Sequence, residues 1–352
     1  MYLASHPVLF ALLALARHRP VVRLGRRVVV NDPDALRTVL TAVPLDRTSP
    51  LTTGGVVHSH GGRGLFDEEG PAHRTARREL GARLDSRGVA ALRPTWLPVL
   101  DDAAAALRRG DTVDVAALAD TVSGRATAVL LGRPDLDAAA CRALASAARD
   151  LAAVTVAAEL PGVRRARRGA AEGHLAEVFG LLGGPPDPLA ATLAVAAVTT
   201  TRVGMPRAVA WCADAGLWDA AADPSRRDAL VGELLRVTTP TPVLPRVPAE
   251  DAVVSGCPVA RGRQLVLVAR HAVGAHHRDP DPDAPAPAAL AQLVFGAGPH
   301  ACPGAALARA QLADVLAVLA PLRPVVVSAR ADRRAALPSW RELRVRAGEV
   351  PR

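Results

Sequence analysis

A cysteine near the end of the chain has the surroundings of a metal-binding thiolate. The segment from Phe295 to Gly304 reads Phe-Gly-Ala-Gly-Pro-His-Ala-Cys-Pro-Gly. Its glycines allow positive-φ turns and a close approach of the backbone to a flat cofactor. Cys302 precedes an expected helix over 305–319, and a helix N-terminus lowers the pKa of a thiol. A thiolate presented in this way suits axial ligation of haem iron. The alternative is a glycine-rich turn that holds a buried structural cysteine.

The spacing Phe-x-x-Gly-x-x-x-Cys-x-Gly in this segment resembles that of the cytochrome P450 family. The resemblance implies that Cys302 is the metal ligand of a haem b group. It also implies that Phe295 packs beside the thiolate and that His300 binds a haem propionate. Gly296 and Gly304 would shape the loop around the cofactor.

A charged pair lies upstream in the order that the resemblance requires. Glu233 and Arg236, in Glu-Leu-Leu-Arg, share one helical face at i, i+3. A buried pair of this kind is tolerable only when both charges are satisfied, so it predicts a fixed internal scaffold. The resemblance assigns Arg246 to a propionate, which suits the donor fork of arginine. Many family members place a further arginine before Phe295, and this chain has none there. We therefore expect a shortened or differently held segment and weaker haem binding.

A basic helix in the N-terminal third supplies two more candidates. His73 and Arg77 stand four residues apart and would share a helical face. The resemblance assigns both to the haem propionates, whereas the alternative is an exposed basic helix. An electron donor of the ferredoxin type would dock on the cysteine side of the haem, near Arg77 and Arg309.

The long apolar stretch from Pro188 to Ala215 is expected to form the central helix over the haem. The family pattern there is Ala-Gly-x-acid-Thr, and this chain has Ala196-Ala-Val-Thr199-Thr200-Thr201. Thr200 replaces the usual threonine and Thr199 stands in place of the acid, so protons would come from water or substrate. These threonines could instead bond to the preceding helical turn. Arg202 resembles, with an offset, the arginine of members that use hydrogen peroxide.

Composition limits the function classes. The 352 residues carry 43 basic side chains, all arginine, and a formal charge of +9. The arginines are spread along helices without interleaved aromatics, which argues against a nucleic-acid partner. The four cysteines have no metal-ligand or disulfide spacing, so we expect a reduced, cytoplasmic protein. The apolar run over 7–16 is too short for a membrane anchor. We also expect a monomer.

The remaining pattern predicts a mainly α fold with small β-sheets, of the cytochrome P450 type. We expect one domain over 1–352, with a β-containing part over about 1–65 and a helix-rich haem-binding body over about 66–352. Val21 to Val30 predicts a hairpin, and Asn31 or Asp32 caps a helix that runs to about residue 42. Further helices are expected at 71–85, 88–109, 113–131, 137–158 and 165–183.

The resemblance implies a haem-thiolate monooxygenase of secondary metabolism that receives electrons from a separate ferredoxin-type donor. The connection between two helices near residues 160–168 is short for the roof of the substrate pocket. We therefore expect a bulky or carrier-tethered small-molecule substrate. Two alternatives stay open: a peroxide-dependent haem-thiolate enzyme (a peroxygenase, or one that rearranges or dehydrates its substrate), and a non-catalytic protein that binds haem or holds a partner.

Overall fold

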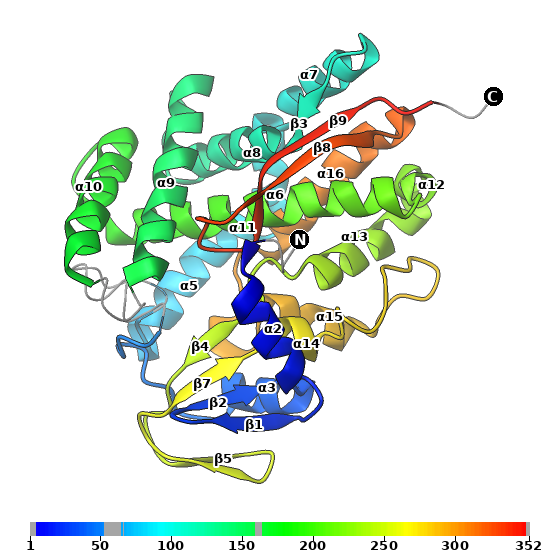
Figure 1. Ribbon diagram of the computed structural model, residues 1–352. Coiled ribbons are helices and arrows are strands. Elements are labelled where there is room, and N and C mark those ends of the chain that lie inside the picture. Colours follow the sequence, from blue (N-terminus) through cyan, green and yellow to red (C-terminus); the bar gives the residue numbers. More distant parts are fainter. Residues whose placement is uncertain (1–4, 53–64, 66, 159–163, 350–352) are drawn as a thin grey trace.

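The structure is a computed structural model that describes residues 5–52, 65, 67–158 and 164–349. Helices form the larger part of the molecule, and short sheets lie at one end and along one side (Figure 1). The helices are α2 Pro7–Ala16, α3 Pro33–Thr41, α5 Gly70–Leu84, α6 Ser86–Leu92, α7 Leu97–Arg108, α8 Val115–Leu130, α9 Ala138–Ala158, α10 Arg164–Leu182, α11 Pro188–Asp214, α12 Trp218–Ala222, α13 Pro224–Thr238, α14 Ala269–Ala272, α15 Ala288–Ala291 and α16 Ala305–Leu319.

The strands form three separate sheets. They are β1 Val21–Leu24, β2 Arg27–Val30, β3 Val113–Asp114, β4 Leu244–Arg246, β5 Ala252–Val254, β6 Cys257–Val259, β7 Gln264–Leu267, β8 Val325–Asp332 and β9 Ser339–Arg346. The largest sheet has the order β1-β2-β7-β4, in which β2 and β7 are parallel and the other pairs antiparallel. The N-terminal hairpin therefore shares its sheet with residues 244–267. This sheet holds β4, which ends at Arg246.

Local chemistry explains the expected helix starts. The Asp32 carboxylate accepts a hydrogen bond from the Ala35 amide, and Pro33 occupies the first turn of α3. Asp187 caps the central helix α11 in the same way, through the Leu189 amide. The fold class, the N-terminal hairpin and the central helix are confirmed.

Two expected helices differ from the structure. The helix expected over 88–109 is divided into α6 and α7 by a 3₁₀ turn at Arg93–Thr95. Pro94 lies in this turn, and proline has no amide hydrogen to continue a helix. The helix expected from residue 113 begins at Val115, because Val113 and Asp114 pair with β9.

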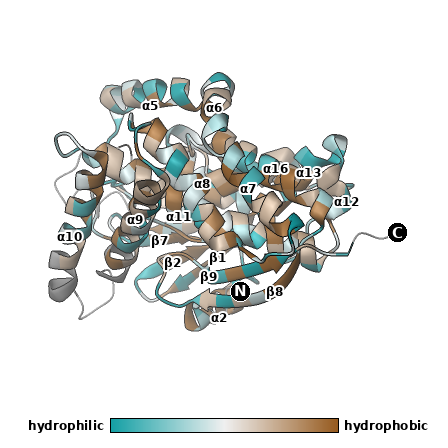
Figure 2. Ribbon diagram, turned by 90° about the horizontal axis from the view of Figure 1, so that it is seen from above, coloured by the Kyte–Doolittle hydropathy of each residue, from teal (hydrophilic) through white to brown (hydrophobic). Residues whose placement is uncertain are grey.

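The main core lies where α7, α8, α11, α13 and α16 meet, and it is built largely from Ala, Leu and Val. Figure 2 shows hydrophobic residues along the inner helices and more hydrophilic residues on the outer helix α5. Cys141 and Cys212 are buried in helices, as predicted, and burial raises the pKa of Cys212 to about 12. By length and composition alone, α11 and the stretch Ala305–Leu322 could cross a bilayer. About half of each stretch is buried inside the protein, as in the core helices of soluble proteins.

Candidate functional site

The loop that carries Cys302 is fixed by its own backbone. The Cys302 amide donates a hydrogen bond of 2.7 Å to the Phe295 carbonyl oxygen. Gly296 and Gly298 have φ values of +76° and +71°, which L-residues rarely adopt. A Cβ at Gly298 would lie 2.7 Å from the Leu40 carbonyl oxygen, so a side chain there would push the loop off α3. Gly304 also lies in a turn, but it has an ordinary φ of −86° and not the positive φ expected from its residue type.

The thiol of Cys302 is accessible to solvent but desolvated. Desolvation raises the thiol pKa, although a hydrogen bond from the Gly304 amide and the charge of Arg77 act to lower it. The helix start therefore acts to lower this pKa, as expected, but desolvation outweighs it. A bound metal cation would lower the pKa of the Cys302 thiol, because coordination deprotonates a thiol.

Phe295, at the start of the cysteine loop, is partly buried and packs against the main core. The guanidinium carbon of Arg309 lies 5.4 Å from the centroid of its ring, which is cation–π geometry. Arg309, expected on a docking surface, is thus half-buried and held by the aromatic ring of the cysteine loop.

Two histidines from distant segments meet beside this loop. The rings of His73 on α5 and His300 are stacked, with centroids 4.1 Å apart and planes at 24°. Burial lowers the pKa of His73 and lowers that of His300 to about 3, and in each case nearby arginine charges lower it further. Nε2 of His73 is buried and has no hydrogen-bond partner in the part of the chain that the structure describes. Both imidazoles are therefore neutral at pH 7 and can donate one hydrogen bond each.

Arg246 ends β4 and completes this cluster. Its Nη1 donates to the Pro245 carbonyl oxygen at 2.7 Å, whereas its buried Nε has no partner among the described residues. Desolvation, followed by the charge of Arg47, lowers its pKa to about 10. Arg77 is half-buried, and desolvation lowers its pKa as well. Buried donors of this kind are costly unless an anion accepts their hydrogen bonds.

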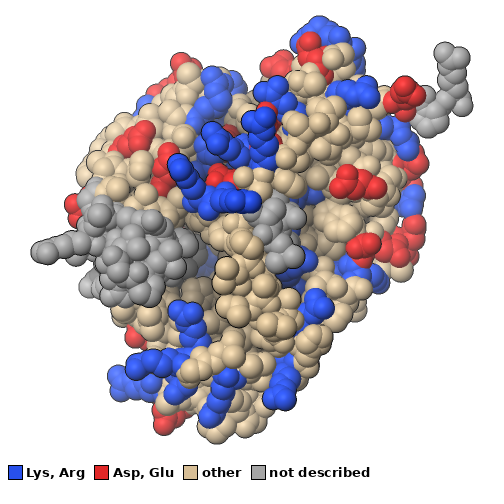
Figure 3. All heavy atoms as spheres, viewed as in Figure 1, with Lys and Arg blue, Asp and Glu red and all other residues tan. Residues whose placement is uncertain are grey.

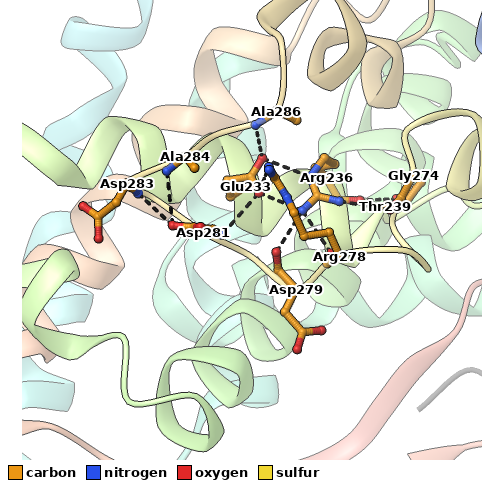
Figure 4. Close-up of polar contacts among 10 residues, drawn as sticks. All are labelled: Glu233, Arg236, Thr239, Gly274, Arg278, Asp279, Asp281, Asp283, Ala284 and Ala286. Carbon is orange, nitrogen blue, oxygen red and sulfur yellow. Dashed lines mark hydrogen bonds and ion pairs between the residues drawn. The ribbon is translucent and has the colours of Figure 1, made fainter.

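A second polar cluster is closed, and Figure 4 shows it. The two Glu233 oxygens accept hydrogen bonds from Arg236 at 2.9 and 2.7 Å and from Arg278 at 3.2 Å. The backbone amides of Asp281 and Ala286 donate to the same carboxylate at 3.3 and 2.9 Å. Burial would raise the pKa of Glu233, but the hydrogen bonds from Arg236 and Ala286 and the charge of Arg236 lower it overall.

A second arginine also takes part in this network. Arg278, in the loop that follows α14, is the second arginine on Glu233. Arg236 also donates to the carbonyl oxygens of Gly274, Arg278 and Asp279, at 3.1 to 3.2 Å. The segment before Phe295 is therefore held by Glu233 and Arg236 without an arginine of its own. The pairing of Glu233 and Arg236 inside the protein agrees with the predicted scaffold.

The polar side chains of α11 have local or distant partners. Thr199 Oγ1 donates to the Val195 carbonyl oxygen at 2.6 Å, and Thr200 Oγ1 donates to that of Ala196 at 2.7 Å. The helix-bonding alternative for these threonines is therefore present in the structure. Arg202 is buried and bonds to Asp120 on α8 at 3.3 Å and to the Arg341 carbonyl oxygen on β9 at 3.0 Å. These contacts give Arg202 a structural ion pair and do not support its expected place beside the iron.

Comparisons with known proteins agree with this arrangement. No family model matches the chain. A stretch of 98 residues is 41% identical to the erythromycin C-12 hydroxylase of Saccharopolyspora erythraea and covers 26% of this chain and 24% of that enzyme. Solved cytochrome P450 structures match almost the whole length. P450BioI in complex with an acyl carrier protein gives a TM-score of 0.78 at 18% identity, over 99% of this chain and 100% of that one.

CYP105P2 from Streptomyces peucetius gives a TM-score of 0.71 at 25% identity, over 96% of this chain and 95% of that one. P450 EryK, solved with erythromycin B, gives 0.74 at 21% identity over 99% and 98%. The chain has the cytochrome P450 fold. The fold implies a haem b group ligated by a cysteine. Beside the Cys302 loop, His73 and Arg246 have nitrogen atoms without a hydrogen-bond partner among the described residues, and these fit the two carboxylates of that group.

Some residues of the site do not follow from sequence motifs. Arg47 is one, because its charge reaches His73, His300 and Arg246. It belongs to no motif, and only the pairing of distant segments brings it close. The short connection expected to form the roof of the pocket falls largely on residues 159–163, which lie outside the described residues. The helices on both sides of it, α9 and α10, pack against each other.

Proposed function

We propose that this cytochrome P450 is a haem-thiolate monooxygenase of secondary metabolism that oxidises a small organic substrate. The observation that carries this proposal is the Cys302 loop, which lies beside buried nitrogen atoms of His73 and Arg246 that have no partner among the described residues. When bound, haem supplies reductive activation of O₂, so that one oxygen atom enters a C–H bond or π-system and the other leaves as water.

The protein contributes an axial ligand and an anion-binding wall. The Cys302 Sγ would ligate the iron, while His73, His300, Arg246 and Arg77 would hold the propionates. Phe295 shields the loop from solvent and positions Arg309 over its ring. These roles rest on donors and burial that the structure supplies for a flat dianionic cofactor.

Proton supply would rely on α11. The Thr199 and Thr200 hydroxyls donate to backbone carbonyls, so each oxygen atom remains free to accept a hydrogen bond from water. We propose that Thr200 orders a water molecule that provides the protons, since the acid of the family pattern is replaced by Thr199. Arg202 is already paired with Asp120, which disfavours the alternative in which an arginine anchors a substrate carboxylate for peroxide chemistry.

The substrate class is inferred from the relatives. Similar structures were solved with erythromycin B, with epothilone D and with a fatty acid carried by an acyl carrier protein. We propose a bulky secondary metabolite, free or carrier-bound, as the substrate of this chain. Electrons would come from a separate ferredoxin-type protein, as in the sequence-based expectation.

The test is turnover by haem-loaded protein with a panel of macrolide and carrier-linked acyl substrates. One set of reactions contains O₂, NADPH and a surrogate ferredoxin with its reductase, and another contains hydrogen peroxide alone. We expect oxygenated product in the first set and none from Cys302→Ser, which should fold normally. Product from peroxide alone would favour the peroxygenase alternative, and product from Cys302→Ser would contradict the proposal.

A further inference from the structure

The segment before α5 runs beside β4 and continues its pairing. Leu45 and Pro248 form an antiparallel bridge, the Asp46 amide donates to the Val247 carbonyl oxygen at 2.8 Å, and the Ala249 amide donates to that of Pro44 at 2.9 Å. In an antiparallel pair, the two residue numbers change in opposite directions. Two residues beyond the bridge, this register places Arg47 opposite Arg246.

Two arginines opposite each other are unfavourable unless a negative charge lies between or beside them. Arg47 Nε donates to Glu69 at 3.0 Å, and this is the one hydrogen bond of its guanidinium group within the described part of the chain. The Arg47 side chain is 12% exposed and that of Glu69 is 57% exposed. Glu69 therefore approaches from the solvent side, and it balances one of the two guanidinium charges. Arg246 has no carboxylate partner among the residues that the structure describes.

The other groups of the site converge on the same place. Glu69 directly precedes α5, which carries His73 in its first turns, and His73 stacks on His300. The positive charge of Arg47 lowers the pKa of His73, Arg246 and His300 alike. Four segments thus present donors to this region, and Arg246 has no ion-pair partner among the described residues.

We propose that Arg47 is a further haem-binding residue, which holds a propionate together with Arg246 while Glu69 fixes its Nε. The inference rests on the proposed function in one respect, namely that the chain binds haem. It assigns the propionate contact to a residue that no sequence motif marks and that depends on the pairing of residues 44–47 with β4.

The experiment measures haem loss from the holoprotein to excess apomyoglobin. We expect Arg47→Leu to lose haem about 10- to 100-fold faster than the wild type, because a charge-assisted hydrogen bond is removed. Arg47→Lys should recover part of the difference, since it keeps the charge. The matched control is Arg37→Leu, which removes another arginine that pairs with a carboxylate, Asp34 at 3.5 Å.

A second cofactor separates propionate binding from a structural role. With iron protoporphyrin dimethyl ester, which lacks both carboxylates, wild type and Arg47→Leu should lose the cofactor at the same rate. Equal rates of haem loss from wild type and Arg47→Leu would overturn the inference while leaving the proposed function intact. A similar effect of the variant on both cofactors would also overturn it. A wild-type protein that binds no haem would overturn the proposed function and this inference together.

Discussion

Two buried charged clusters of this protein differ in one respect, which is whether their hydrogen bonds are complete. Around Glu233, two arginines and two backbone amides satisfy both carboxylate oxygens, and Glu233 and Arg236 are 1% and 2% exposed (Figure 4). Around Arg246 and His73, buried nitrogen atoms have no partner in the described chain. The first cluster is complete without a ligand, and the second is the one that a ligand must complete.

The surface charge does not show this difference. Figure 3 shows arginines spread over the viewed face and interspersed with acidic side chains. The formal charge of +9 therefore says little about function by itself. What distinguishes the candidate site is that Arg246 is desolvated and has no counterion among the described residues.

The largest expected effect is a loss of stability when the hydrogen-bond network around Glu233 is broken. Glu233→Gln removes the carboxylate that pairs with buried Arg236 and should lower the free energy of unfolding by about 3–5 kcal/mol. The loss should be the same with and without haem, since the cluster needs no ligand. Denaturant unfolding of both forms measures it, with the exposed Glu250→Gln as the control. A change below about 1 kcal/mol would show that the network is not a scaffold.

The second prediction is that removing an arginine changes the stability of the protein without haem in opposite directions in the two clusters. Arg246→Met replaces a desolvated cation by an apolar side chain, so the protein without haem should be unchanged or more stable by about 1 kcal/mol. The holoprotein should lose haem about tenfold faster or more, because a propionate partner is gone. Arg236→Met should instead destabilise both forms. A similar loss of stability in the protein without haem for both variants would erase the distinction between the clusters.

A histidine group on and after α14 predicts a pH effect. Burial, followed by the charges of His276, Arg270, Arg17 and His277, lowers the pKa of His271 to about 3. Burial and three of those neighbours lower that of His276 to about 4, although the Arg270 backbone raises it slightly. Both are neutral in the folded protein, whereas the unfolded chain takes up protons below about pH 6.5. Stability should therefore be full above pH 6.5 and fall toward pH 4.

Denaturant midpoints between pH 7.5 and 4.5 measure this effect. His276→Gln should make the dependence on pH shallower than in the wild type. The result should hold with and without haem, because burial and neighbours other than the donors around Arg246 and His73 set these two pKa values. An unchanged slope in the variant would assign the loss of stability to other residues.

The smallest effect is expected at the rim of the closed cluster. The Arg278 side chain is 44% exposed, so its ion pair with Glu233 is largely screened by solvent. Arg278→Gln should cost about 1 kcal/mol or less in thermal or chemical unfolding and leave haem retention unchanged. A large loss of haem in this variant would contradict the prediction that the network around Glu233 is independent of the haem-binding residues.

Sequence patterns predicted the parts of this molecule that depend on local chemistry. The cysteine loop, the Glu233–Arg236 pair and the start of α11 follow from residues within a few positions of one another. Contacts between distant segments did not follow: Arg278 on Glu233, Arg202 on Asp120 and Arg47 opposite Arg246 each join elements far apart in the chain. The pKa of Cys302 was predicted from the helix start alone, and the desolvation that outweighs it depends on the surrounding fold.

The most direct test of the account is the absorption spectrum of purified, reduced protein with carbon monoxide. The account predicts the strongly red-shifted Soret band of a thiolate-ligated haem, and its loss in Cys302→Ser at unchanged folding. A band at the position typical of a neutral ligand would contradict Cys302 as a thiolate ligand. The absence of any haem signal from protein made with ample haem would contradict the assignment of the cluster around Arg246 and His73 to haem binding.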